Sequence, residues 1–265
     1  MNVQLVLAAF CLTAFERDFA PPRPVESLPP SNFAVSAALQ AGDEAYKRFD
    51  NVAALAAYNR ALALDSSNYP ALWKATRAYV DVGHATKDEE QKQNYQRAEK
   101  IARRCLALHP DSAESHFVLA MALGRVALQV GGKRKIEFSK EIKAEADRTL
   151  ALDPCHDGAM HILGRWHYEL ANLSWILKSF AKILYGGVPP GGGRAEARQW
   201  FEKAIACDSR LPLHHLWLGK TLMELKEYDR ARENFQKCVD LPDLYWDDSI
   251  NKSEAEKLLL KIKKE

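Results

Sequence analysis

The stretch PLHHLWLGKTLMELKEYDRARENFQKCVDLP, residues 212–242, carries the clearest structural pattern in the chain. Its apolar residues recur at helical spacing on both sides of a polar turn around residues 225–228, which predicts two amphipathic helices. Small residues surround one aromatic residue, so the two helices should interlock with the ring between them. These residues are Gly219 on the first helix and Ala231, Phe235 and Cys238 on the second.

The same pattern recurs along the chain. The small residues near the ends of the second helices, Ala61, Cys105, Thr149, Ala204 and Cys238, are separated by 44, 44, 55 and 34 residues. Each of the first four precedes the small residue of the next helix by 15 residues, and those partners are Thr76, Ala120, Gly164 and Gly219. A spacing of 34 is that of tetratricopeptide repeats, whose helix pairs stack into a solenoid. The repeat-signature residues are Gly42, Ala54, Tyr58, Ala61, Gly164, Ala197, Phe201, Ala204, Gly219, Ala231, Phe235 and Cys238.

The sequence therefore predicts an all-α, tetratricopeptide-like α-solenoid of about five helix pairs with a C-terminal capping helix. Because the junctions between pairs keep a constant length, the extra residues must lie inside the second, third and fourth pairs. These inserts are residues 81–95, 130–140 and 173–194, and part of this length is expected to extend helices. Residues 173–184, LSWILKSFAKIL, are predicted to form an additional amphipathic helix, which either packs on the solenoid or lies on a membrane.

Three regions are predicted. Residues 1–30 form a leader with a proline-rich linker, and are interpreted either as a targeting or anchoring segment or as disordered. Residues 31–245 form the repeat domain, and residues 246–265 the capping helix that covers the apolar end of the last pair. Ser253 and Glu256 form a possible capping box at the start of that helix.

Composition limits the possible functions. The chain has 265 residues, 47% of them hydrophobic, and a formal net charge of +2, which gives no reason to expect nucleic-acid binding. The 5 cysteines are odd in number and scattered, so we expect no disulfide framework and a reducing compartment.

The chain resembles a known family, the regulators of microtubule dynamics. The resemblance rests on HILGRWHYELANLSWILKSFAKILYGGVPP, EARQWFEKAIACDS and LWLGKTLMELKEYDRARENFQKCVDLP, with similar stretches ALWKATRAYVDVG and LALHPDSAESHFVLAMALG upstream. Together these cover about residues 34–242. The most specific feature is Trp175 after the first helix of the fourth pair, followed by a basic amphipathic stretch and a proline-containing loop.

The resemblance implies a non-enzymatic helical-repeat interaction protein that binds microtubules or microtubule- and spindle-associated proteins. It implies a location in the cytoplasm, at the cytoskeleton or spindle pole, or at mitochondria. The alternative is a phospholipid-binding or membrane-contact module at mitochondria, since one family member tethers endoplasmic reticulum to mitochondria and carries phospholipid in its repeats. No cofactor is implied, and no functional residue transfers one by one.

Candidate partner-binding residues form a basic run at the second insert. Lys133, Arg134 and Lys135 are followed by Lys140 and Lys143, and clustered cations would attract the acidic surface of a microtubule or an anionic membrane. Glu137, Glu141 and Glu145 alternate with them, which is equally typical of a solvated helix face.

Other candidate sites are weaker. Cys155, His156, His161 and His167 lack the paired spacing of a zinc site, so no metal ligands are predicted. Glycines 191–193 before Arg194 could bind an anion at a helix start, but no phosphate-loop motif accompanies them and a flexible connection is the simpler interpretation. No nucleophile, base and orienting residue occur in a pattern that supports catalysis, so no catalytic residue is predicted.

Overall fold

The computed structural model describes residues 32–172 and 192–262, and within them every regular element is an α-helix. The helices are α1 (Asn32–Lys47), α2 (Asn51–Leu64), α3 (Tyr69–Ala85), α4 (Asp88–Leu108), α5 (Ala113–Val126), α6 (Gly132–Leu152), α7 (Asp157–Asn172), α9 (Arg194–Cys207), α10 (Pro212–Glu224), α11 (Tyr228–Asp240) and α12 (Asp248–Ile262). The predicted leader, the predicted helix at 173–184 and Gly191 lie outside the described residues.

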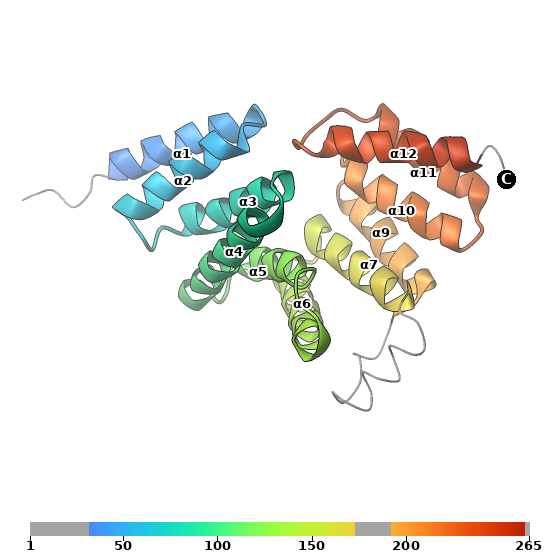
Figure 1. Ribbon diagram of the computed structural model, residues 1–265, viewed down its shortest axis with the longest axis horizontal. Coiled ribbons are helices and arrows are strands. Elements are labelled where there is room, and N and C mark those ends of the chain that lie inside the picture. The colour runs from blue at the N-terminus through green and yellow to red at the C-terminus, as the bar shows by residue number, and fades with distance from the viewer. Residues whose placement is uncertain (1–31, 173–191, 263–265) are drawn as a thin grey trace, which may run out of the picture.

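The helices stack as consecutive pairs in an arc that runs from α1 to α12 (Figure 1). The pairs are α1/α2, α3/α4, α5/α6, α7/α9 and α10/α11, and α12 packs on the last pair. The predicted all-α solenoid of five pairs with a further C-terminal helix is therefore confirmed. The first helices of neighbouring pairs α3, α5, α7 and α10 contact one another in turn, as expected for helices that line the inner side of such an arc.

Each regular pair is joined by a glycine that lies against an aromatic ring. A Cβ atom added to Gly219 would lie 2.5 Å from Phe235, and one added to Gly164 would lie 2.5 Å from Phe201. In the first pair Gly42 lies against Tyr58 in the same way. These distances leave no room for a side chain, because real Cβ contacts are longer than 3.0 Å. All twelve repeat-signature residues are buried.

In the second pair, the contact between a glycine and an aromatic ring lies at a different position along the helices. Thr76 and Ala102 occupy the positions that glycine and the aromatic residue take in the regular pairs, and both are buried. Seven residues after Thr76, Gly83 lies against Tyr95, which is seven residues before Ala102. Seven residues are about two helical turns, so the contact stays on the same helix faces but moves outward along both helices.

The extra length of the second and third pairs extends helices. α3 has 17 residues and α4 and α6 have 21 each, whereas α10 and α11 have 13. The gap between α3 and α4 is Thr86 and Lys87 alone, so the predicted insert at residues 81–95 is almost entirely helical.

The C-terminal helix begins five residues earlier than the capping box predicts. α12 starts at Asp248, so Ser253 and Glu256 lie inside the helix and the predicted capping box is wrong. Asp248 is buried, and its Oδ2 accepts hydrogen bonds from the backbone N–H groups of Leu244 and Tyr245 at 2.9 and 2.8 Å. This carboxylate fixes the turn before the helix, a task that the sequence pattern assigned to Ser253.

The cysteines depart from the sequence-based expectation. Cys155 and Cys207 form a disulfide that joins the turn before α7 to the end of α9 across 52 residues of chain. The expectation of unlinked cysteines in a reducing compartment is therefore wrong for this pair. The sequence distance hid the pairing, but the fourth helix pair folds back and brings its two ends together. Cys105 and Cys238 are free and buried.

The glycine contact predicts a stability effect with a built-in control. Gly219→Ala should lower the free energy of unfolding by about 1–3 kcal/mol, because the new Cβ overpacks the fully buried Phe235. Gly124→Ala, also in a helix but with nothing within 4 Å of an added Cβ, should not destabilise the chain. Urea unfolding of the three proteins measures both effects, and equal midpoints would contradict the role of the contact.

The disulfide predicts a redox-dependent stability. Closing a loop of this length should stabilise the chain by about 2–4 kcal/mol. A dithiol reductant should therefore lower the free energy of unfolding of the wild type by that amount, and leave Cys155→Ser/Cys207→Ser unchanged. Thiol titration of the denatured chain should find two fewer thiols before reduction than after it; an equal count would show that the bond does not form.

Candidate functional site

The predicted basic run forms the first turn of α6 and the exposed face that follows it. Lys133, Arg134, Lys135 and Lys140 are exposed, and Lys143 is half-buried. Among the described residues, Glu137 is the carboxylate that pairs with Lys133 and Arg134, at 3.8 and 3.6 Å. These pairs remain largely in solvent, since the side chains of the two cations are 72% and 59% exposed. Such exposed pairs contribute little stability.

Lys140 and Lys143 differ in their surroundings. Lys140 lies seven residues after Lys133, so the two share one face of the helix. Lys143 donates to Asp147 at 2.6 Å and its ammonium lies 5.8 Å from the Trp166 ring centroid. Lys143 is therefore held on the body of the solenoid, whereas the first four cations are exposed, although the Arg134 guanidinium carbon also lies 4.3 Å from the Phe138 ring centroid. We call Lys133, Arg134, Lys135 and Lys140 the basic edge.

The basic edge conflicts with the local preferences of a helix. The positive end of a helix dipole lies at the N-terminus, where acidic side chains stabilise and cations destabilise. The first turn of α6 carries no acidic residue, and no side chain caps it at Gly131. By contrast, α4 begins with Asp88, Glu89 and Glu90. A conflict of this kind marks residues that are not explained by folding alone.

The inner side of the arc holds a second group of cations. Arg165 of α7 lies with its guanidinium carbon 3.6 Å from the Trp217 ring centroid, and the Lys220 ammonium lies 4.1 Å from the same centroid. Burial lowers the pKa of Arg165, Glu169 opposes this, and Arg125 of α5 lowers it further. The Arg165 Nε is buried and has no hydrogen-bond partner among the described residues. Both cations also contact carboxylates of the chain: Arg165 donates to Glu169 at 3.2 Å and Lys220 to Glu254 at 2.7 Å, so this surface presents ion pairs around an aromatic ring.

Sequence reasoning missed these inner cations, although they occupy a regular position in the repeats that could have identified them. Each follows directly after a small residue at the repeat junction: Arg77 after Thr76, Arg165 after Gly164 and Lys220 after Gly219. Arg125 likewise follows Gly124, one turn beyond the junction residue Ala120. The position after the junction residue therefore places a side chain on the inner side of the arc.

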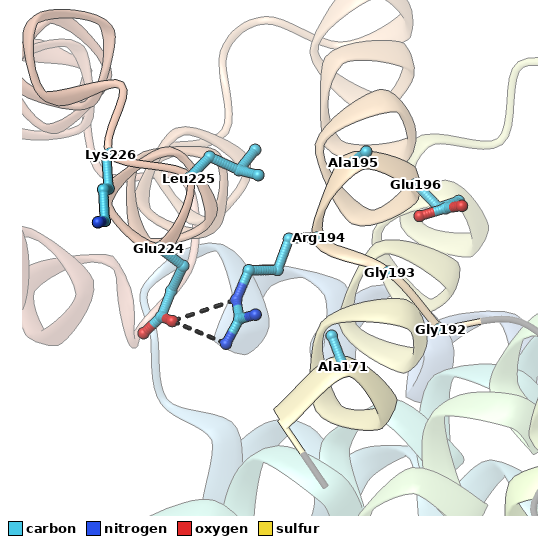
Figure 2. A pocket seen from close by; sticks show the side chains of 9 residues that line it. All are labelled: Ala171, Gly192, Gly193, Arg194, Ala195, Glu196, Glu224, Leu225 and Lys226. Atoms are coloured by element: carbon cyan, nitrogen blue, oxygen red, sulfur yellow. Dashed lines mark hydrogen bonds and ion pairs between the residues drawn. The ribbon is translucent and has the colours of Figure 1, made fainter.

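A cleft of about 510 Å³, with both apolar and charged lining residues, lies where α7, α9 and the turn between α10 and α11 meet (Figure 2). Arg194 lies across it, 3.1 Å from Glu224 Oε2, and donates to Asn172 Oδ1 at 2.8 Å. The Glu196 carboxylate folds back over Gly193, where an added Cβ would collide with it. A carboxylate of the chain itself thus covers the helix start that the sequence offered as an anion site.

The histidines serve packing and hydrogen bonding. His161 Nδ1 lies 3.0 Å from His214 Nδ1, and His214 Nε2 lies 2.9 Å from Asp157 Oδ2. Gly192 N donates to the buried His167 at 3.3 Å, and His156 lies 3.5 Å from Glu114. In the part of the chain that the structure describes, no three His, Cys, Asp or Glu side chains come together in a way that could hold a metal ion.

The fold defines the class of protein as a tetratricopeptide-like solenoid. A thermophilic tetratricopeptide protein of Thermus thermophilus has the same fold, with a TM-score of 0.63 at 16% identity, covering 84% of this chain and 100% of that one. Family and fold of this kind are typical of non-enzymatic interaction proteins. No helix in residues 32–172 or 192–262 combines the length and apolar character that a membrane span requires.

The chain belongs to the family of regulators of microtubule dynamics proteins 1–3, whose family model matches residues 38–263. Regulator of microtubule dynamics protein 1 of Bos taurus is 30% identical over 74% of this chain and 62% of its own length. Protein 3 of Rattus norvegicus is 28% identical over 71% of this chain and 40% of its own, and protein 2 of Homo sapiens 23% identical over 73% and 47%. The chain thus spans between two fifths and two thirds of the length of these relatives.

Buried histidines predict a pH-dependent stability. Burial, then His214 and Arg165, hold the pKa of His161 well below its ordinary 6.5. Below pH 6.5 the unfolded chain therefore binds a proton that the folded chain refuses, and this group makes the folded state less stable as the pH falls. His161→Gln should lose less stability than the wild type between pH 7.5 and 5.0. Denaturant unfolding at both pH values tests this, and parallel losses would contradict it.

Proposed function

We propose that this chain is an interaction scaffold that binds microtubules or microtubule-associated proteins, using the basic edge of α6 and the inner surface of the solenoid. One observation carries the proposal: three exposed cations, Lys133, Arg134 and Lys135, begin α6 against the preference of the helix dipole, with one carboxylate near two of them. The names of the relatives in three mammals support the choice of partner.

The inner surface adds a second contact region to this proposal. Arg125, Arg165 and Lys220 lie on the first helices of three successive pairs, and Trp217 lies between two of these cations. An acidic, extended partner segment would meet cations along the arc, while the basic edge would provide longer-range attraction. Binding of this kind places the chain at the cytoskeleton or spindle pole.

The alternative, a phospholipid-binding or membrane-contact module at mitochondria, finds less support. Two cavities among the described residues, the cleft of about 510 Å³ and one of about 210 Å³, each include charged side chains in their lining. These charges would lose their contact with water beneath a bound acyl chain, which is costly. Microtubule binding is therefore the better proposal.

Charge reversal at the basic edge tests the proposal. Lys133→Glu/Arg134→Glu/Lys135→Glu should weaken co-sedimentation with microtubules at low salt by tenfold or more, because three attractive charges become repulsive. Wild-type binding should fall steeply as salt rises, since exposed charges are screened.

The chain offers a matched control. Lys237→Glu/Lys257→Glu/Lys261→Glu reverses three exposed cations on α11 and α12 and changes the net charge by the same amount. This variant should co-sediment like the wild type. Equal weakening by both triple variants would assign the attraction to net charge alone, and an absence of wild-type binding at low salt would overturn the proposal.

A further inference from the structure

The segment between α11 and α12, residues 241–247, reaches toward the C-terminal ends of α1 and α3 (Figure 1). We call it the strap. The Tyr245 ring lies edge-on to Tyr46 of α1, with centroids 6.5 Å apart, and the Arg77 guanidinium carbon lies 5.6 Å from the Tyr245 centroid. The last turn of the solenoid therefore contacts the first, about 200 residues earlier in the chain.

The neighbouring strap residues make polar contacts with α3. Trp246 lies edge-on to His84, with ring centroids 5.3 Å apart. Asp247 Oδ2 lies 4.0 Å from His84 Nδ1. Asp81 also accepts a hydrogen bond from the Tyr46 hydroxyl at 2.8 Å. The strap thus places two aromatic rings and a carboxylate against polar and aromatic side chains of α1 and α3.

This contact has the composition of a bound peptide and not of a helix-pair junction. Tyr245, Trp246 and Asp247 are each only half-buried, whereas the junction aromatics Phe201 and Phe235 are fully buried. The strap also brings two carboxylates together: burial first, and then the charges of Asp81 and Asp248, raise the pKa of Asp247 to about 6, with Arg125 opposing them.

Space remains beside the strap. A cavity of about 210 Å³ lies next to Tyr46 and Arg77 and is lined further by Asp43, Lys47, Tyr58, Trp73 and Lys74. The Arg77 guanidinium carbon lies 5.8 Å from the Trp73 ring centroid, so its planar group faces aromatic rings on more than one side. A partner segment could therefore use the strap's contacts and fill this cavity as well.

We propose that the inner face of α1 and α3 is a peptide-binding surface for an extended segment that carries Tyr or Trp beside Asp or Glu, and that the strap occupies it in cis. The proposal rests on the part of the proposed function that assigns partner binding to the inner surface. The strap itself shows the chemistry that fits, since its sequence is LPDLYWD. A partner would have to displace the strap, so the strap acts as a built-in competitor.

The tether determines how strong this competition is. A segment linked by a short connection competes at an effective concentration on the order of millimolar, without any new contact. A free segment that makes the same contacts would therefore bind the wild type weakly, in proportion to the fraction of molecules whose strap is open. Removing the strap's side chains should restore the intrinsic affinity.

The experiment uses the full chain and a fluorescein-labelled peptide with the sequence of residues 241–249, read by fluorescence anisotropy. Tyr245→Ala/Trp246→Ala should bind the peptide at least tenfold more tightly than the wild type. Adding Arg77→Ala to this variant should remove most of the gain. A peptide with both aromatic residues replaced by alanine should bind to neither protein.

A matched control and a second measurement keep the outcome decisive. Ile250→Ala/Leu260→Ala alters two exposed apolar residues of α12, outside the strap, and should bind like the wild type. If the strap variant does not fold, hydrogen exchange of the wild type replaces it: excess unlabelled peptide should speed exchange within residues 241–247. A folded strap variant with wild-type affinity, or exchange that the peptide leaves unchanged, would overturn the proposal. Because the peptide-binding assay contains no microtubules, a negative result in it would not contradict the proposed microtubule binding, which the co-sedimentation assay tests separately.

Discussion

The contact between a glycine and an aromatic ring is the constraint on which the solenoid depends. At Gly42, Gly164 and Gly219 the ring of the partner helix occupies the volume that a side chain would take. The two helices of a pair can then approach closely over a length of three or four turns, and the fully buried rings exclude water from the junction. Because each pair contacts mainly its neighbours, this one local arrangement, repeated, sets the course of the whole arc.

The repeat spacing predicted this architecture because the junctions follow from local packing. The constant 15-residue distance between pairs located every helix pair, and the all-α fold is confirmed. Features that depend on distant contacts were not accessible in the same way. The Cys155–Cys207 disulfide joins residues 52 positions apart, whose proximity follows from the folding back of the fourth pair. The Asp248 turn is local, and it was missed because the Ser253–Glu256 pattern drew the expected helix start to Ser253. The second pair shows the limit most clearly, since Gly83 and Tyr95 moved two turns away from the expected register and lost the signature.

The candidate site also contains one group of residues that are adjacent in the sequence and one group that are far apart in it. The basic edge could be predicted from the sequence as a run of cations. The structure adds that three of them, Lys133, Arg134 and Lys135, lie in the first turn of a helix and oppose its dipole. The inner cations were not readable as a group, because Arg77, Arg125 and Arg165 are spread over 88 residues. Their common feature is a position directly after a junction residue or its equivalent one turn on. In a repeat protein, residues at equivalent positions of successive repeats lie on one surface. Such a surface can be predicted from one sequence only after the repeats have been aligned with one another.

The strap covers part of the inner surface of the arc. A solenoid is open-ended, so its inner surface would ordinarily be free along its full length. Here the turn before α12 comes back to α1 and α3, and Tyr245 and Trp246 contact the region that begins the arc. The closure is made by half-buried aromatic rings and by a carboxylate placed near Asp81, not by interlocked helices. The half-buried rings of the strap remove less apolar surface from water than the fully buried rings of the junctions, so this closure contributes less to stability than the junctions do.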